Sequence, residues 1–172
     1  MRFDTLLIED NPGDARLIQE MLAESGGDQY VLDHADRLST GLEKLSSRNF
    51  DAVLLDLMLP DSRGLNTARE VLLYGPSVPI IILSGLNHEL LAYQALTEGV
   101  QDYLVKGLFN ATALLRALRH AIARQRLQST VHGLALLKRS YRTVYAPGVP
   151  ASGRSVSEDG APGRQEFFSG RS

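Results

Sequence analysis

Short apolar runs alternate along the chain with longer segments in which apolar residues recur at helical spacing. The short runs predict five strands, at residues 3–8, 30–35, 51–57, 79–83 and 101–105. The longer segments predict five helices, which begin near Ala15, Leu38, Leu65, His88 and Asn110. This alternation predicts an α/β fold: a doubly wound, five-stranded parallel sheet with helices on both faces, in three layers.

Turn-forming residues separate the predicted elements. The run Asn11-Pro12-Gly13-Asp14 interrupts the pattern after the first strand and is suited to capping the helix that follows. Gly26-Gly27 is expected to end this first helix, and Gly75-Pro76 to end the third.

Polar residues stand where the predicted strands end. Glu9 and Asp10 follow the first strand, Asp56 lies at the end of the third, Ser84 follows the fourth and Lys106 follows the fifth. Because chemistry in such sheets gathers at the carboxyl ends of the strands, we expect these side chains to lie together. Three neighbouring carboxylates repel one another unless a cation binds. Oxygen ligands alone favour Mg²⁺ as that cation.

These residue types are suited to phosphoryl transfer onto a carboxylate. Asp56 can act as the nucleophile and form an acyl phosphate. Mg²⁺ and Lys106 would supply positive charge to the moving oxygens, and Ser84 a hydrogen bond. Each residue alone also has an ordinary interpretation, as a solvated loop acid, a turn cap, a turn hydroxyl or a surface charge. Their combination at one sheet edge favours a phospho-aspartate site.

Composition narrows the class of protein. The formal net charge of −2 gives no overall attraction to nucleic acid or to an acidic membrane. The chain has no cysteine, which excludes disulfides, thiolate metal sites and thiol catalysis. No apolar run approaches the roughly 18 residues of a membrane span, and the first residues lack the pattern of a secretion signal. We therefore expect a cytoplasmic protein.

Four separated motifs resemble the receiver domain of bacterial two-component response regulators. They read Leu-Leu-Ile-Glu-Asp-Asn-Pro-Gly-Asp-Ala (6–15), Leu-Leu-Asp-Leu-Met-Leu-Pro-Asp-Ser-Arg-Gly-Leu (54–65), Ile-Ile-Leu-Ser-Gly (81–85) and Gly-Val-Gln-Asp-Tyr-Leu-Val-Lys (99–106). The resemblance implies a receiver domain over residues 1–126. It also implies a flavodoxin-like sheet with the strand order 2-1-3-4-5.

The resemblance implies a role for each residue of the predicted site. Asp56 is implied as the phospho-acceptor and Lys106 as the contact to the phosphoryl group. Asp10 is implied as a direct Mg²⁺ ligand, Glu9 as a ligand acting through water, and the backbone carbonyl of Met58 as a further ligand.

The resemblance also implies a two-state switch. Phosphate on Asp56 would attract the hydroxyl of Ser84, and Tyr103 would rotate into the space that Ser84 leaves. Gly64 fits the turn after the active-site loop, and Gly85 keeps room beside the phosphate.

One position departs from the family pattern. Proline commonly follows the lysine, often with a cis peptide bond, but Gly107 follows Lys106 here. Because a cis bond without proline costs about 3 kcal/mol, we expect a trans bond or a rearranged loop at this position.

The implied partners are proteins. A sensor histidine kinase or a phosphotransfer protein would donate the phosphoryl group. The surface of the fourth helix, fifth strand and fifth helix would change its preference for an unknown downstream protein. A homodimer through this surface or through the C-terminal helix is a further expectation. The chain is expected to be a phosphoryl acceptor with at most slow self-dephosphorylation, and not an enzyme.

The residues after 126 lie beyond the resemblance. Leu127, Val131, Leu134 and Tyr141 follow a 4-3-7 spacing, which predicts that the fifth helix continues over residues 127–145 with an apolar stripe. This extension is either a signalling helix that pairs with a partner or a second copy, or a linker that folds back on the domain or frays. Residues 146–172 are rich in Gly, Pro and Ser and are predicted to be a disordered tail.

Two other functions stay open at this point. The chain is either a receiver that acts alone or part of a longer regulator with a sensory, kinase or cyclic-dinucleotide output module. A Mg²⁺-dependent phosphatase or hydrolase on the same α/β plan usually needs a second acid two residues after the nucleophile. Met58 occupies that position here and argues against such an enzyme.

Overall fold

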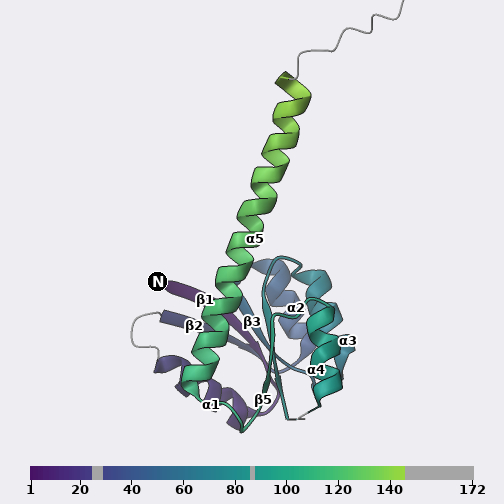
Figure 1. The fold of residues 1–172 in the computed structure, drawn as a ribbon. Helices are drawn as coiled ribbons and strands as arrows, with labels where there is room; N and C mark the ends of the chain where they lie inside the picture. Colours follow the sequence, from purple (N-terminus) through teal and green to yellow (C-terminus); the bar gives the residue numbers. More distant parts are fainter. Residues whose placement is uncertain (25–28, 86–87, 146–172) are drawn as a thin grey trace, which may run out of the picture.

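The five strands form one parallel sheet in the computed structural model, which describes residues 1–24, 29–85 and 88–145 (Figure 1). The strands are β1 (Arg2–Ile8), β2 (Gln29–Ala35), β3 (Ala52–Asp56), β4 (Ile80–Ser84) and β5 (Asp102–Val105). Their spatial order is β2-β1-β3-β4-β5, and every neighbouring pair is parallel. The predicted doubly wound, flavodoxin-like fold is therefore confirmed.

Five helices connect and follow the strands. They are α1 (Pro12–Ala23), α2 (Leu38–Ser47), α3 (Leu65–Tyr74), α4 (Glu89–Thr97) and α5 (Ala111–Tyr145). Helix α1 begins three residues before the predicted Ala15, because the Asn11 side chain caps it by accepting the N–H groups of Gly13 and Asp14. The predicted helix end at Gly26-Gly27 and the predicted disordered tail at 146–172 lie outside the described residues.

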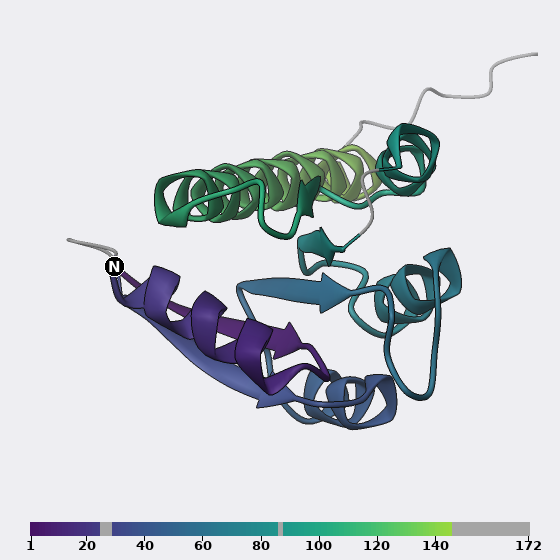
Figure 2. The same cartoon turned by 90° about the horizontal axis from the view of Figure 1, so that it is seen from below.

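The helices cover the sheet in two groups. Helices α1 and α5 lie on one face, and α2, α3 and α4 lie on the other, as Figure 2 shows from below. Successive strand residues point to opposite faces. In β3, for example, Leu54 belongs to the apolar cluster under α1 and α5, and its neighbours Val53 and Leu55 belong to the cluster under α2, α3 and α4. Burial on both faces explains the continuous apolar runs of the sequence.

The chain direction across the sheet reverses at β1. After β1 the chain moves to β2 at one edge of the sheet, and it then crosses over to β3 on the other side of β1. In open α/β sheets, the carboxyl ends of the strands at such a reversal form the usual ligand-binding crevice. The topology therefore directs attention to the residues that follow β1 and β3.

Helix α2 packs closely against β1 at Gly41. A Cβ atom on this residue would overlap Cδ1 of the fully buried Ile8. We expect Gly41→Ala to lower the free energy of unfolding by about 1 kcal/mol, because the overpacking outweighs the better helix propensity of alanine. Urea denaturation measures this loss. In an Ile8→Val background, which lacks Cδ1 but keeps Cγ1, the loss should shrink, and equal losses in both backgrounds would contradict the contact.

Helix α5 is one continuous helix of 35 residues. Its last buried side chain among the described residues is Ile122, and the helix then projects beyond the edge of the sheet at which β1 begins (Figure 1). Among the described residues, no helix combines the length and the apolar character that crossing a membrane requires.

Candidate functional site

The strand register brings the predicted site residues to one edge of the sheet. Ile8 pairs with Leu55, so that Glu9 comes next to Asp56 at the ends of β1 and β3. Asp56 in turn pairs with Leu83, and Ser84 follows at the same edge. The carboxyl ends of three neighbouring strands therefore carry Glu9, Asp56 and Ser84 side by side.

Three acids gather at this edge. Each of Glu9, Asp10 and Asp56 offers a carboxylate oxygen, and these three oxygens lie within 4.8 Å of one another. Glu9 and Asp56 are buried, whereas Asp10 is exposed. Burial raises the pKa of Glu9 to about 7; the Lys106 ammonium opposes this shift, and the nearby Asp56 carboxylate adds to it. A group of oxygen ligands with one acid that is costly to ionise suits a hard divalent cation.

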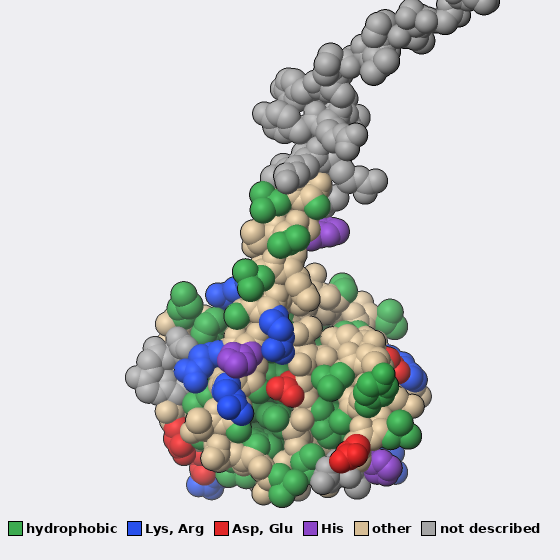
Figure 3. Space-filling view, in the orientation of Figure 1, with side chains coloured by type: hydrophobic (Ala, Val, Ile, Leu, Met, Phe, Trp, Pro, Cys, Tyr) green, Lys and Arg blue, Asp and Glu red, His purple; other side chains and the backbone are tan. Residues whose placement is uncertain are grey.

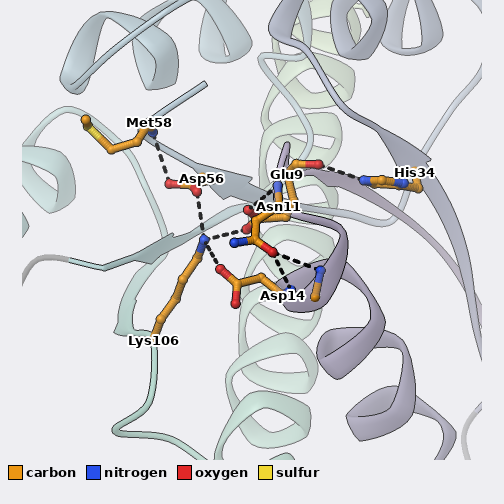
Figure 4. A network of polar contacts seen from close by, with 8 residues as sticks. Glu9, Asn11, Asp14, His34, Asp56, Met58 and Lys106 are labelled. Atoms are coloured by element: carbon orange, nitrogen blue, oxygen red, sulfur yellow. Dashed lines mark hydrogen bonds and ion pairs between the residues drawn. The ribbon is translucent and has the colours of Figure 1, made fainter. Parts of the chain in front are cut away.

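The Lys106 ammonium lies among the carboxylates (Figure 4). Its Nζ is 2.6 Å from Oε2 of Glu9, 2.7 Å from Oδ2 of Asp56 and 2.9 Å from Oδ2 of Asp14. Burial alone would lower the pKa of Lys106, but hydrogen bonds to Asp56, Glu9 and Asp14 outweigh it and raise the pKa above its usual value. The ammonium is therefore a fixed positive charge beside Asp56.

The loop after β3 orients the Asp56 carboxylate. The Met58 N–H donates to Oδ1 of Asp56 at 3.0 Å, while Oδ2 faces Lys106. The loop closes through the Gly64 N–H, which donates to the Leu57 carbonyl at 2.7 Å. Gly64 has φ +67°, a conformation that favours glycine, as expected for the turn after this loop. The two oxygens of Asp56 thus have different partners.

Ser84 and Tyr103 lie on the same face of the sheet. Ser84 is buried at the end of β4, and Tyr103 of β5 pairs with Ile82, two residues earlier. Because residues two apart in a strand share a face, Ser84 points to the side on which Ile82 and the half-buried Tyr103 pack. A Cβ on the next residue, Gly85, would meet no atom within 4 Å, so the space in front of Gly85 is open.

The turn after Lys106 is built around glycine. Gly107 has φ +80°, and the Leu108 N–H donates to the Val105 carbonyl at 3.0 Å. Proline, whose φ is fixed at about −65°, cannot adopt this conformation. The loop is therefore arranged differently from a loop that carries proline after the lysine. The Lys106 N–H still donates to the Ser84 carbonyl, which anchors the lysine to β4.

Three residues near the site were not assigned a role from the sequence. Asp14, in the first turn of α1, contacts Lys106. His34 donates from Nε2 to the Glu9 carbonyl at 2.7 Å. Asp61, in the loop after β3, accepts the N–H groups of Leu38 and Ser39 and so caps α2. Asp14 and Asp61 both belong to the motifs quoted above, but only the folded chain shows their partners.

Comparisons with known proteins identify the family. The response regulator receiver domain family matches residues 5–119. The chain is 30% identical over 127 residues to the transcriptional regulatory protein ZraR of Klebsiella oxytoca. The matched region covers 74% of this chain and 28% of ZraR. It is 36% identical over 114 residues to the transcriptional regulatory protein DltR of Streptococcus agalactiae serotype III, and this match covers 66% of this chain and 49% of DltR. The chain thus spans less than half of each of these relatives.

Solved structures show the same relationship. The receiver domain of a sensor histidine kinase from Pseudomonas aeruginosa, which has a magnesium ion in its active site cleft, is 30% identical with a TM-score of 0.60 and covers 72% of this chain and 99% of that domain. The signal receiver domain of an HD domain-containing protein from Pseudomonas fluorescens is 28% identical with a TM-score of 0.66, and the match covers 75% of this chain and 93% of that domain. The chain belongs to the family of response regulator receiver domains.

Proposed function

We propose that Asp56 accepts a phosphoryl group from a sensor histidine kinase or a phosphotransfer protein, and that a cytoplasmic signalling pathway uses this modification. The proposal rests on the groups that surround the Asp56 carboxylate. This carboxylate ends a buried strand, lies 2.7 Å from the Lys106 ammonium and belongs to a cluster of three acids. Among the described acids, only Glu9 and Asp56 combine an ammonium partner with this cluster, and the Glu9 side chain is fully buried.

The residues can perform the transfer in one displacement. An oxygen of Asp56 attacks phosphorus, the new O–P bond forms, and the bond to the donor breaks with its electron pair leaving on the donor. Lys106 stabilises negative charge on the phosphoryl oxygens, and the Met58 N–H keeps the carboxylate oriented. Mg²⁺, held by Asp10, Asp56, Glu9 and the carbonyl of Met58, would supply further positive charge to these oxygens.

The phosphoryl group is proposed to act through Ser84 and Tyr103. The Ser84 hydroxyl would turn toward the phosphoryl oxygens, and Tyr103 would move further into the space on the same sheet face. The surface next to this pair carries exposed apolar side chains of α4, namely Leu90, Tyr93 and Leu96. A change in the packing of Tyr103 would therefore alter the shape of an apolar surface that is suited to binding a downstream protein.

The experiment that tests this function is labelling with acetyl phosphate. We expect the protein to gain one phosphoryl group in the presence of Mg²⁺ and to lose it in hydroxylamine, which cleaves acyl phosphates. EDTA should prevent the labelling. Steady hydrolysis of a phosphate ester with Mg²⁺, without a labelled protein, would instead favour the phosphatase alternative.

The projecting part of α5 is proposed to pair with a second copy of the chain. Leu127, Val131 and Leu134 are 68%, 66% and 54% exposed, and Figure 3 shows apolar side chains on this part of the helix. Nine residues, or about two and a half helical turns, separate Leu127 from the buried Leu118, so the stripe faces away from the domain's own side of the helix. A second helix can therefore approach the stripe without meeting the domain.

We expect Val131→Asp to shift the protein from dimer to monomer. A charge placed at the centre of the stripe would have to be buried without a partner in the dimer. Light scattering coupled to size exclusion, over a range of concentrations, measures the change. Ser129→Asp adds the same charge at an exposed position on the opposite side of the helix and should leave the dimer intact. A wild-type protein that is monomeric at every concentration would disprove this pairing.

A further inference from the structure

Three carboxylates lie close to the Lys106 ammonium. They belong to Glu9, Asp14 and Asp56, at 2.6 to 2.9 Å (Figure 4). An ammonium has three donors and no more. The ammonium donates hydrogen bonds to Asp14 and Asp56 and forms an ion pair with Glu9, so a phosphoryl oxygen that binds it must displace one of these contacts.

The three carboxylates differ in their access to water. The side chain of Glu9 is 0% exposed and that of Asp56 is 7% exposed, whereas that of Asp14 is 37% exposed. A buried carboxylate that loses the ammonium keeps its charge in a place that water hardly reaches, which is costly. Asp14 can exchange the ammonium for water at the rim of the site. Asp14 is thus the partner that Lys106 can release most easily.

The position of Asp14 is set by its own helix. It lies in the first turn of α1, where the Asn11 side chain accepts its N–H at 3.2 Å. It is not one of the three acids whose oxygens gather for a cation. Its side-chain contact joins the start of α1 to the residue that follows β5, across 92 positions of the chain.

We propose that Asp14 is a positioning residue that takes the place of a phosphoryl oxygen. In the unmodified protein it holds the Lys106 ammonium on the α1 side of the site, and it yields the ammonium when Asp56 carries a phosphoryl group. The proposal rests on the proposed function of Asp56. Asp14 therefore competes with the phosphoryl group for Lys106, and its charge limits how strongly the modified state is favoured.

Beryllofluoride, an anion that mimics a phosphoryl group on a carboxylate, provides the test. Its dissociation constant is measured by ¹⁹F NMR at a Mg²⁺ concentration that saturates every variant. We expect Asp14→Asn to bind it about two- to fivefold more tightly, the size of effect typical of a partly exposed ion pair. Asp14→Glu keeps the charge and should bind like wild type. Glu20→Gln removes an exposed acid from the same helix, away from Lys106, and should change nothing.

A double variant separates the proposal from simple charge repulsion. In a Lys106→Met background, Asp14→Asn should no longer tighten binding, because the competition needs the ammonium. The same tightening in both backgrounds, or no tightening in either, would overturn the proposal. Absence of binding by wild type would contradict the phospho-acceptor function itself.

A second measurement keeps the test valid if Lys106→Met binds too weakly. In magnesium-free protein without beryllofluoride, the side-chain ¹⁵Nζ resonance of Lys106 should shift in Asp14→Asn and not in Glu20→Gln. An unshifted resonance in Asp14→Asn would show that the two side chains do not interact, whatever the function of Asp56.

Discussion

Asp56→Asn is expected to abolish phosphoryl incorporation from acetyl phosphate, with a loss of more than about 10³-fold in rate. An amide oxygen is a far weaker nucleophile than a carboxylate and cannot form an acyl phosphate. The amide has nearly the same shape, and its oxygen can still accept the Met58 N–H that now binds Oδ1. The loss should therefore come from chemistry and not from unfolding. Intact-mass spectrometry of the labelled protein measures it.

Asp36→Asn is the matched control for this change. Asp36 is an exposed acid that directly follows β2 at the same edge of the sheet, but it is not part of the cluster of Glu9, Asp10 and Asp56. The Asp36→Asn variant should therefore be labelled like the wild-type protein. If Asp56→Asn kept its label and the label mapped to another acid, Asp56 would not be the acceptor.

Lys106→Met is expected to lower the free energy of unfolding by about 3 kcal/mol in the absence of Mg²⁺. Methionine has a similar length but no charge, so Glu9 and Asp56 would lose their shared ammonium partner while both are buried. Urea denaturation at neutral pH measures the loss. Added Mg²⁺ should recover part of it, since a cation can offset the charge of the same carboxylates.

Lys44→Met tests whether the effect belongs to the site. Lys44 also pairs with a carboxylate, that of Asp33, at 2.7 Å, but both side chains are about a quarter to a third exposed (30% and 27%). A pair in contact with water contributes at most about 1 kcal/mol. Equal losses for Lys44→Met and Lys106→Met would contradict the view that burial makes the Lys106 contacts important.

The strands and their polar ends could be predicted because the information is local. A run such as Val53 to Leu55 is apolar because both faces of β3 are covered, and Asp56 stands out because it ends that run. Parallel pairing then brings the ends of β1, β3, β4 and β5 to one edge without any knowledge of side-chain contacts. Glu9, Asp10, Ser84 and Lys106 were found in this way.

Other features depend on contacts between distant segments and could not be predicted. From the sequence, Asp14 resembles a helix-capping or surface acid. Only the structure shows that the turn after β5 places Lys106 beside it. Asp61 caps α2 although more than twenty residues separate it from Leu38, because the loop after β3 folds over the start of that helix. The positive φ of Gly107 likewise depends on how the chain leaves β5, which the order of residues alone does not determine.

Because α5 is long, a small tilt of the helix on the sheet would move its far end by a larger distance. The helix begins five residues after Lys106, runs along the sheet and leaves it beyond Ile122 (Figure 1). Residues 127–145 form a stiff arm about 28 Å long, so a tilt of about 5° where the helix lies on the sheet displaces the end of the arm by about 2.5 Å. Side chains that interlock across a helix pair respond to shifts of that size. A repacking at one sheet edge that tilted the helix would therefore become a larger displacement at the far end of the arm.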